Sequence, residues 1–391
     1  MYNLKTLVCF LSPKSGNSFS EQLNNCFEQL HNFTERQNIP SGRIVALTFF
    51  VATKSRDQYQ NFKATINSYI RKLYGKAQPA VACVAQAPEN GNYIGLEVFL
   101  EHGLSNKVTY KQFEDTPYVV VEHKDYKEIY ASGLTGIING DIYENSNMAF
   151  ALMEKILNAE NLNFSNIVRQ WNYIENITHV PDKRQNYQHY QIFNDVRSDY
   201  YNKSEFINGY PSATGIGTDI CGLIINFIAI STAANMQIVP VLNPGQIDAY
   251  KYSQKVLIGS GVNKREYKSS PKFERGKLVR TDEGTKIYIS GTAAIIGENT
   301  MFPTDVEKQT MVTINNIKKL VESESVPKMD NIQPIEKNNY SYVRSYVKHK
   351  KDIDIVKRLC EKHFRSECFQ YLISDICRDN LLVEIEGLIE Y

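Results

Sequence analysis

Three stretches rich in β-branched and aromatic residues decide the fold: IVALTFFV at residues 44–51, IVRQWNYI at 167–174 and YVRSYVK at 342–348. This composition is typical of β-strands. Each stretch is followed by a polar segment and then by a segment that we expect to be helical. The three expected helices span residues 57–74, 185–201 and 352–364. The same order therefore occurs three times in one chain, which predicts an internal repeat.

Each expected helix leads to two more strands, which complete the second half of the repeated unit. These strand pairs are expected at 80–86 with 93–101, at 212–220 with 223–230, and at 368–375 with 381–390. The first half also repeats, because YASG at 130–133 is matched by YISG at 288–291. The helices of this first half are expected near 21–34, 147–157 and 306–322, and the first copy keeps only a short strand, 7–11, before its helix.

The unit reads strand, strand, helix, strand, helix, strand, strand, which predicts an α+β fold with two helices covering one face of a sheet. Generic α+β periodicity would explain one copy, but three copies in the same order favour tandem units. Linkers are expected near 103–107 and 231–237, and the polar stretch 322–339 reads as an insertion. The expected division is a partial unit at 1–104, a second unit at 105–235 and a third at 236–391.

Composition excludes several classes of protein. The 391 residues carry 44 Lys and Arg against 43 Asp and Glu, so no basic excess suggests a nucleic-acid partner. With 42% hydrophobic and 22% charged residues, the chain can bury a core and is not of a disordered type. The longest apolar run, 222–230, is too short to span a membrane, and the run at 6–11 is too short for a signal peptide. We therefore expect a cytoplasmic protein.

Cysteine and histidine patterns give no sign of a metal or cofactor. The seven cysteines are odd in number and include no CxxC pair, so neither a disulfide framework nor a zinc site is expected. The seven histidines form no HxH or HExxH pattern. The sequence also lacks a GxSxG nucleophile motif and a P-loop lysine motif.

The repeated unit resembles the Rid (YjgF) family, most clearly in the third copy. The matching segments are AYKYSQ at 249–254, ISG at 289–291, KQT at 308–310 and VEIE at 383–386. Rid proteins are trimers with ligand sites in the clefts between subunits. The resemblance therefore implies tandem Rid-like units that form an intramolecular pseudo-trimer, so that the chain would be monomeric.

From about residue 90 to the C-terminus, the chain is similar to a narrower family, the chorismatases. The ordered matches are VRQWNYI at 168–174, FNDVR at 193–197, ATGIG at 213–217, SGTAA at 290–294 and DICRDNLLVE at 375–384. This resemblance implies hydrolysis of the enolpyruvyl ether of chorismate without a metal or an organic cofactor. The products would be pyruvate and either a dihydrodiol or a hydroxybenzoate. Of these ring products, 3-hydroxybenzoate is the one we expect.

Chorismate is a dianion, so its site needs cationic groups, and arginine matches a carboxylate well. The resemblance places the binding arginines on Arg197 and Arg358, in the second helices of units two and three. Arg275 is a further candidate without an assigned role. Tyr252 matches a Rid-like tyrosine at the mouth of the site. The competing interpretations are solvated helix arginines and an interface tyrosine.

The reaction begins with a proton delivered to the terminal methylene carbon of the enol ether, and the resemblance assigns this step to Glu384. A carboxylic acid stays protonated near neutral pH if its site is apolar. Strand alternation places Glu384 and Glu386 on one face, with Val383 and Ile385 on the other. Glu386 is therefore the local competitor, and a salt-bridged structural carboxylate is the alternative interpretation of Glu384.

Two positions are implied to steer the product. In the resembling family, a glycine at Gly291 and a cysteine at Cys377 mark the branch that forms 3-hydroxybenzoate. A thiolate can act chemically when its pKa is lowered, and the neighbouring Arg378 is a candidate to lower it. The competing interpretation of Cys377 is a small buried hydrophobic residue.

Two other functions remain as alternatives. A Rid-type enamine or imine deaminase would use an arginine on the strand before the final hairpin, but residues 368–374 contain none, and Arg365 lies off the motif. A non-catalytic protein that binds a small molecule is the second alternative. The combination of Arg197, Arg358 and Glu384 argues against it.

Overall fold

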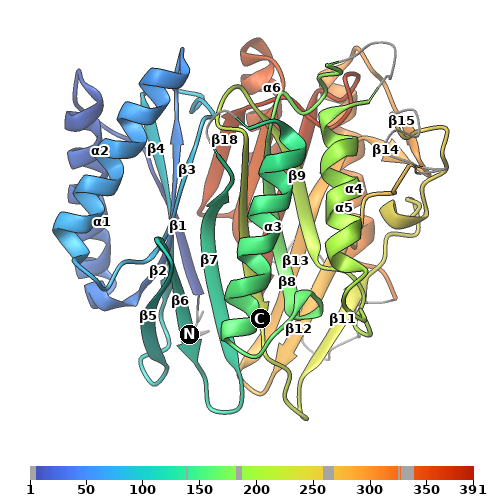
Figure 1. The fold of residues 1–391 in the computed structure, drawn as a ribbon. Helices are drawn as coiled ribbons and strands as arrows, with labels where there is room; N and C mark the ends of the chain where they lie inside the picture. The colour runs from blue at the N-terminus through green and yellow to red at the C-terminus, as the bar shows by residue number, and fades with distance from the viewer. Residues whose placement is uncertain (1–5, 138–139, 182–186, 259–267, 325, 327–338) are drawn as a thin grey trace.

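The computed structural model describes residues 6–137, 140–181, 187–258, 268–324, 326 and 339–391 (Figure 1). The first two residues of the helix expected at 185–201 and most of the insertion expected at 322–339 lie outside these ranges. Within them the chain forms three main β-sheets. The first contains β1 (Thr6–Leu11), β2 (Ile44–Val51), β3 (Ala80–Val84) and β4 (Ile94–Glu101).

The second and third sheets are larger because each gains two antiparallel strands at its start. The second contains β5 (Lys107–Phe113), β6 (Thr116–Glu122), β7 (Lys127–Thr135), β8 (Ile167–Glu175), β9 (Ser212–Thr218) and β10 (Leu223–Ile230). The third contains β11 (Gln237–Val241), β12 (Gly276–Thr281), β13 (Gly284–Ala293), β16 (Asn339–Val347), β17 (Arg365–Ser366), β18 (Phe369–Ile373) and β19 (Val383–Glu390). A small separate hairpin pairs β14 (Ile295–Ile296) with β15 (Asn299–Thr300).

One strand order recurs in all three sheets. It is β1-β4-β2-β3 in the first, β7-β10-β8-β9 in the second and β13-β19-β16-β18 in the third. In each sheet the last pair of this series is parallel, namely β2 with β3, β8 with β9, and β16 with β18. The α+β class and the tandem repeat are therefore confirmed, and the first copy has only the short strand β1 before its helix, as expected.

Two helices cover one face of each sheet. They are α1 (Phe19–Arg36) and α2 (Arg56–Tyr74), α3 (Ile142–Ala159) and α4 (His189–Tyr201), and α5 (Val306–Val321) and α6 (Ile353–His363) (Figure 1). Helix α3 begins at Ile142, earlier than the expected start at 147, because Asp141 and Glu144 form a capping box. Among the described residues, none of these helices is long and apolar enough to cross a membrane.

The uncovered faces of the three sheets share one hydrophobic core. It includes Phe50 of the first sheet, Tyr130 of the second and Tyr346 of the third. Three contacts link the sheets in a closed series: β3 meets β7, β9 meets β13, and β1 meets β16. Because both faces of the inner strands are buried, a strand such as β2 reads as a continuous apolar run. A threefold symmetry relation between the units remains a prediction.

Candidate active site

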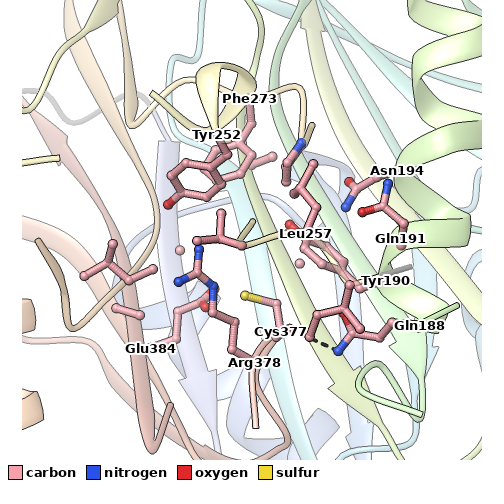
Figure 2. Close-up of a pocket in the computed structure, with 18 of the residues that line it drawn as sticks. Gln188, Tyr190, Gln191, Asn194, Tyr252, Leu257, Phe273, Cys377, Arg378 and Glu384 are labelled. Carbon is pink, nitrogen blue, oxygen red and sulfur yellow. Dashed lines mark hydrogen bonds between the residues drawn. The ribbon is translucent and has the colours of Figure 1, made fainter. Parts of the chain in front are cut away.

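A pocket lies at the seam between the second and third sheets, close to the contact of β9 with β13. Two isolated backbone bridges, Ser212 with Glu274 and Ile216 with Ile376, cross the same seam. The pocket is narrow and leaves about 50 Å³ for the centre of a water-sized sphere. Its described lining combines apolar, amide and charged side chains: Gln188, Tyr190, Gln191, Asn194, Ala213, Gly215, Tyr252, Val256, Leu257, Ile258, Pro271, Phe273, Arg275, Gly291, Ala293, Ile295, Cys377, Arg378 and Glu384 (Figure 2).

Glu384 supplies the one carboxyl group among the described residues that line the pocket. It lies in β19 opposite Ala293 of β13 and is 4% exposed. Desolvation by burial raises the pKa of Glu384 to about 8, and the nearby Glu386 adds to the effect, whereas Arg169 and Arg275 oppose it. This carboxyl group is therefore protonated at neutral pH and able to act as an acid.

Glu386 lies on the same face of β19 but in a different environment. Its carboxylate accepts a hydrogen bond from Trp171 Nε1 at 2.9 Å and pairs with Arg169 Nη2 at 2.5 Å and Arg344 Nη1 at 3.1 Å. Its side chain is fully buried and does not line the pocket. Two guanidinium groups hold Glu386 in the central core, so it is not placed to donate a proton to a ligand.

Because Gly291 has no side chain, the Glu384 carboxyl group can lie directly against its backbone. A Cβ atom built on Gly291 would overlap Glu384 Oε1 and would lie 2.9 Å from Glu384 Cδ. On its other side the same Cβ would meet the methyl group of Thr214 at 3.1 Å. Glycine is needed here for close approach, and any side chain would move the carboxyl group.

Two arginines reach the pocket, and Tyr252 lies between them. Arg275 is 4% exposed and donates from Nη2 to Tyr252 Oη at 2.7 Å and to the carbonyl of Ile247 at 2.5 Å. Arg378 donates to the carbonyl of Glu298 at 2.8 Å. The guanidinium carbons of Arg275 and Arg378 lie 5.4 and 5.3 Å from the Tyr252 ring centroid. The described lining thus carries two cations and one neutral acid.

Arg197 lies behind the pocket wall and not in it. It is 2% exposed, and its Nη2 donates at 2.5 Å to Oδ1 of Asn194, which does line the pocket. Burial lowers the pKa of Arg197, and a hydrogen bond with Tyr190 opposes that effect. The expected role of Arg197 in direct binding is therefore replaced by an indirect contact through Asn194 and Tyr190.

The structure places Arg358 away from the pocket. Its side chain is 61% exposed on α6 and pairs with Glu307 of α5 at 3.0 Å. It is absent from the described lining of the pocket. The arginine belongs to the solvated face of an amphipathic helix, whose buried side is formed by Ile353, Val356 and Leu359. Arg378, considered above only for its effect on a thiol, occupies the pocket instead.

Cys377 reaches the pocket, but its thiol is not activated. Desolvation by burial raises the pKa of Cys377 to about 12, and the charge of Glu384 contributes, while Arg378 and Arg275 oppose the shift. Arg378 therefore acts on the thiol in the expected direction, but desolvation outweighs it and the pKa of Cys377 is raised overall. Figure 2 shows the Cys377 sulfur beside Glu384 and Arg378.

The pocket also contains polar residues that the sequence alone did not reveal. The amide side chains of Gln188, Gln191 and Asn194 lie across the pocket from Glu384 (Figure 2). Asn194 Nδ2 is buried and has no hydrogen-bond partner among the described residues. The FNDVR motif contained this signal, because Asn194 and Arg197 are three residues apart on one helix face. Within the described ranges, no group of three or more His, Cys, Asp or Glu side chains is arranged to hold a metal ion.

Parts of the sequence are similar to proteins of the chorismatase family. The profile of the family described as "Chorismatase FkbO/Hyg5-like, N-terminal" matches residues 97–229. A 3-hydroxybenzoate synthase from Streptomyces hygroscopicus is 26% identical over 256 residues, which cover 64% of this chain and 70% of the relative. A chorismatase from Streptomyces rapamycinicus is 28% identical over 239 residues, covering 58% of this chain and 65% of the relative.

The fold is also that of a solved chorismatase. That crystal structure matches with a TM-score of 0.67 and 18% sequence identity, and the match covers 98% of each chain. The chain is therefore similar in sequence to chorismatases over part of its length and has the fold of a solved chorismatase.

Proposed function

We propose that the protein is a chorismatase that releases pyruvate from chorismate, with Glu384 as the acid that starts the reaction. The observation that carries this proposal is a buried carboxyl group with its pKa raised to about 8, facing a pocket that also holds two arginines. The relatives named chorismatase and 3-hydroxybenzoate synthase support an enzyme of this type.

Charge supports a dianionic substrate. Arg275 and Arg378 supply two positive charges to the described lining, and Glu384 in its neutral form supplies no negative charge. Each guanidinium group can bind one carboxylate of chorismate, and Tyr252 lies between the two arginines. The apolar side chains of Val256, Leu257 and Phe273 offer contacts to the ring.

In the proposed first step, Glu384 gives its proton to the terminal methylene carbon of the enol ether. That carbon becomes a methyl group, and the ether-bearing carbon becomes an oxocarbenium ion. The Glu384 carboxylate left behind lines the pocket and can stabilise this cation, whereas Glu386 is already paired with Arg169 and Arg344. A proton delivered by a positioned acid typically accelerates such a step by about 10²–10⁴-fold.

In the hydrolytic branch, water adds to the oxocarbenium carbon and forms a hemiketal. The bond from that carbon to the ring oxygen then breaks, so pyruvate leaves as a ketone and the ring keeps its oxygen as a hydroxyl group. One proton of the water restores the acid form of Glu384, and the other moves from the hemiketal hydroxyl to the ring oxygen as the bond breaks. Gln188, Gln191 and Asn194 lie across the pocket from Glu384 and can hold this water.

The aromatic product, 3-hydroxybenzoate, is the finer part of the proposal. Chorismate has the same atoms as pyruvate plus a hydroxybenzoate, so this branch consumes no water overall. Gly291 leaves room at the acid, and Cys377 presents a neutral thiol to the pocket. In this proposal the Cys377 side chain occupies space that water would otherwise enter, so that its loss favours hydrolysis.

The test is to incubate the protein with chorismate in D₂O with a metal chelator present, beside a sample without protein. The proposal expects pyruvate carrying one deuterium in its methyl group, together with 3-hydroxybenzoate detected by chromatography. Dihydrodiol as the only ring product would overturn the aromatic branch but not the chorismatase activity. Absence of pyruvate above the protein-free sample would overturn the function.

A further inference from the structure

The strand that faces Glu384 contains a β-bulge, and this bulge leaves a backbone donor to be satisfied. Ser290 and Gly291 of β13 together lie opposite the single residue Glu386 of β19. A bulge takes one residue out of the ladder of backbone hydrogen bonds. The N–H of Gly291 donates instead to Thr214 Oγ1 at 3.0 Å, across the seam between the second and third sheets.

The hydroxyl group of Thr214 makes three hydrogen bonds, which is all that a hydroxyl can make with ordinary geometry. It accepts from Gly291 N and from Arg169 Nη2 at 2.7 Å, and it donates to Glu386 Oε2. Thr214 is 1% exposed and is not among the residues that line the pocket, although its neighbours Ala213 and Gly215 are. Its side chain therefore connects the bulge to the buried ion pair without touching a ligand.

The second unit contains the same bulge and satisfies it differently. Ser132 and Gly133 of β7 lie opposite Asn226 of β10, and Gly133 N donates directly to Asn226 Oδ1 at 2.8 Å. In the third unit Glu386 takes the place of Asn226. Because Arg169 and Arg344 already hold the Glu386 carboxylate, the bulge N–H there reaches it through the Thr214 hydroxyl.

The hydrogen bond from Gly291 N to Thr214 Oγ1 affects Glu384, because Glu384 lies next to Gly291. A Cβ atom on Gly291 would overlap Glu384 Oε1, so the carboxyl oxygen lies directly against the Gly291 backbone. A backbone N–H that bonds to a carboxylate stabilises its ionised form. We propose that Thr214 is a positioning residue that occupies the Gly291 N–H and thereby leaves Glu384 as an uncharged acid.

This inference rests on the proposed function, because it explains how the acid of that reaction is maintained. Titratable and charged groups face Glu384 from several elements: Glu386 on its own strand, Arg169 on β8, Arg275 before β12, Tyr190 on α4, and Cys377 and Arg378 before β19. Gly291, on the facing strand β13, places its backbone against the same carboxyl group.

The experiment replaces Thr214 with Val, which keeps the shape and removes the hydroxyl group. In Thr214→Val the Gly291 N–H is released, so the pH midpoint of kcat/KM for pyruvate release should fall by about one unit, and activity at pH 7.5 by about threefold. Thr214→Ser should restore the wild-type midpoint. Thr218→Val, the same change on the same strand at a hydroxyl that contacts Cys221, should leave the midpoint unmoved.

A second readout does not depend on turnover. Infrared titration of the carboxyl C=O stretch that disappears in Glu384→Gln reports the protonation of Glu384 directly. If its midpoint moves in Thr214→Val and returns in Thr214→Ser, the inference holds even should chorismate prove not to be the substrate. An unchanged midpoint in both Thr214→Val and Thr214→Ala would overturn it, whatever the turnover. Thr214→Ala also replaces the valine variant if that variant does not fold.

Discussion

Replacing Glu384 with Gln should make the protein nearly inactive and, at neutral pH, more stable. The wild-type carboxyl group has a pKa raised from 4.5 to about 8 in the folded state. When the pKa of an acid is higher in the folded state than in the unfolded state, the group costs no folding free energy at pH values below the unfolded pKa. As the pH rises toward the folded pKa, the unfolded state ionises first, and the folded state loses stability relative to it. At 1.36 kcal/mol per unit, the cost to wild type reaches at most about 4 kcal/mol at pH 7.5 and about 1 kcal/mol at pH 5. Glutamine has the same shape and avoids this cost.

Urea unfolding of the wild type and Glu384→Gln at pH 5 and pH 7.5 measures the difference. The matched control is Glu386→Gln, the same change two residues along the same face of β19. It should destabilise by about 3–5 kcal/mol, because Arg169 and Arg344 lose a buried partner. If Glu384→Gln also destabilises the protein at pH 7.5, Glu384 is a paired carboxylate and the reasoning is refuted. Pyruvate release by Glu384→Gln should fall by about 10²–10⁴-fold.

Further substitutions test the rest of the pocket. Arg275→Ala and Arg378→Ala should each raise KM for chorismate by about 10–100-fold through loss of a charge-assisted hydrogen bond. The surface change Arg358→Ala should leave the kinetics unaltered. The reverse pattern would restore the substrate-binding role that the sequence suggested for Arg358. Cys377→Ala should shift the product, measured by chromatography, from hydroxybenzoate toward dihydrodiol without abolishing pyruvate release, and an unchanged product ratio would remove the thiol from product control. Gly291→Ala should displace the neighbouring carboxyl group and lower kcat by about 10–100-fold with a smaller change in KM, and a wild-type kcat would show that the close approach is not required.

The repeated fold was predictable because its signals are local. Strand β2 spans Ile44–Val51 and β10 spans Leu223–Ile230, the bounds expected from their β-branched and aromatic runs. Alternation along β19 also placed the two glutamates on one face and Val383 on the other, where it packs in the helix-covered core. Such periodic patterns depend on neighbours in sequence.

The roles of the two glutamates could not be separated locally. Glu386 is charge-paired because Arg169, more than two hundred residues earlier in the chain, reaches it from the second sheet. Glu384 lacks such a direct pair and is raised in pKa by desolvation. The distinction arises only when the units pack together.

The positions of the pocket arginines also could not be predicted from local sequence. The position of Arg358 on a repeated helix suggested a ligand role, but the rotation of α6 turns it to solvent beside Glu307. Arg378 follows a strand in a loop, where no periodicity indicates its direction, and it reaches the pocket. The raised pKa of Cys377 was not predictable, because sequence adjacency to Arg378 says nothing about the desolvation that dominates it.

The pH dependence of kcat/KM for pyruvate release from chorismate tests most directly whether Glu384 acts as a neutral acid. The kcat/KM profile reports the free enzyme, in which the pKa of Glu384 is raised to about 8. We predict that activity is constant from about pH 6 to 7 and falls tenfold per unit above a midpoint near 8, because the proton donor is lost. Activity that rises with pH through this range would show that the essential group acts as a base, and would contradict the account.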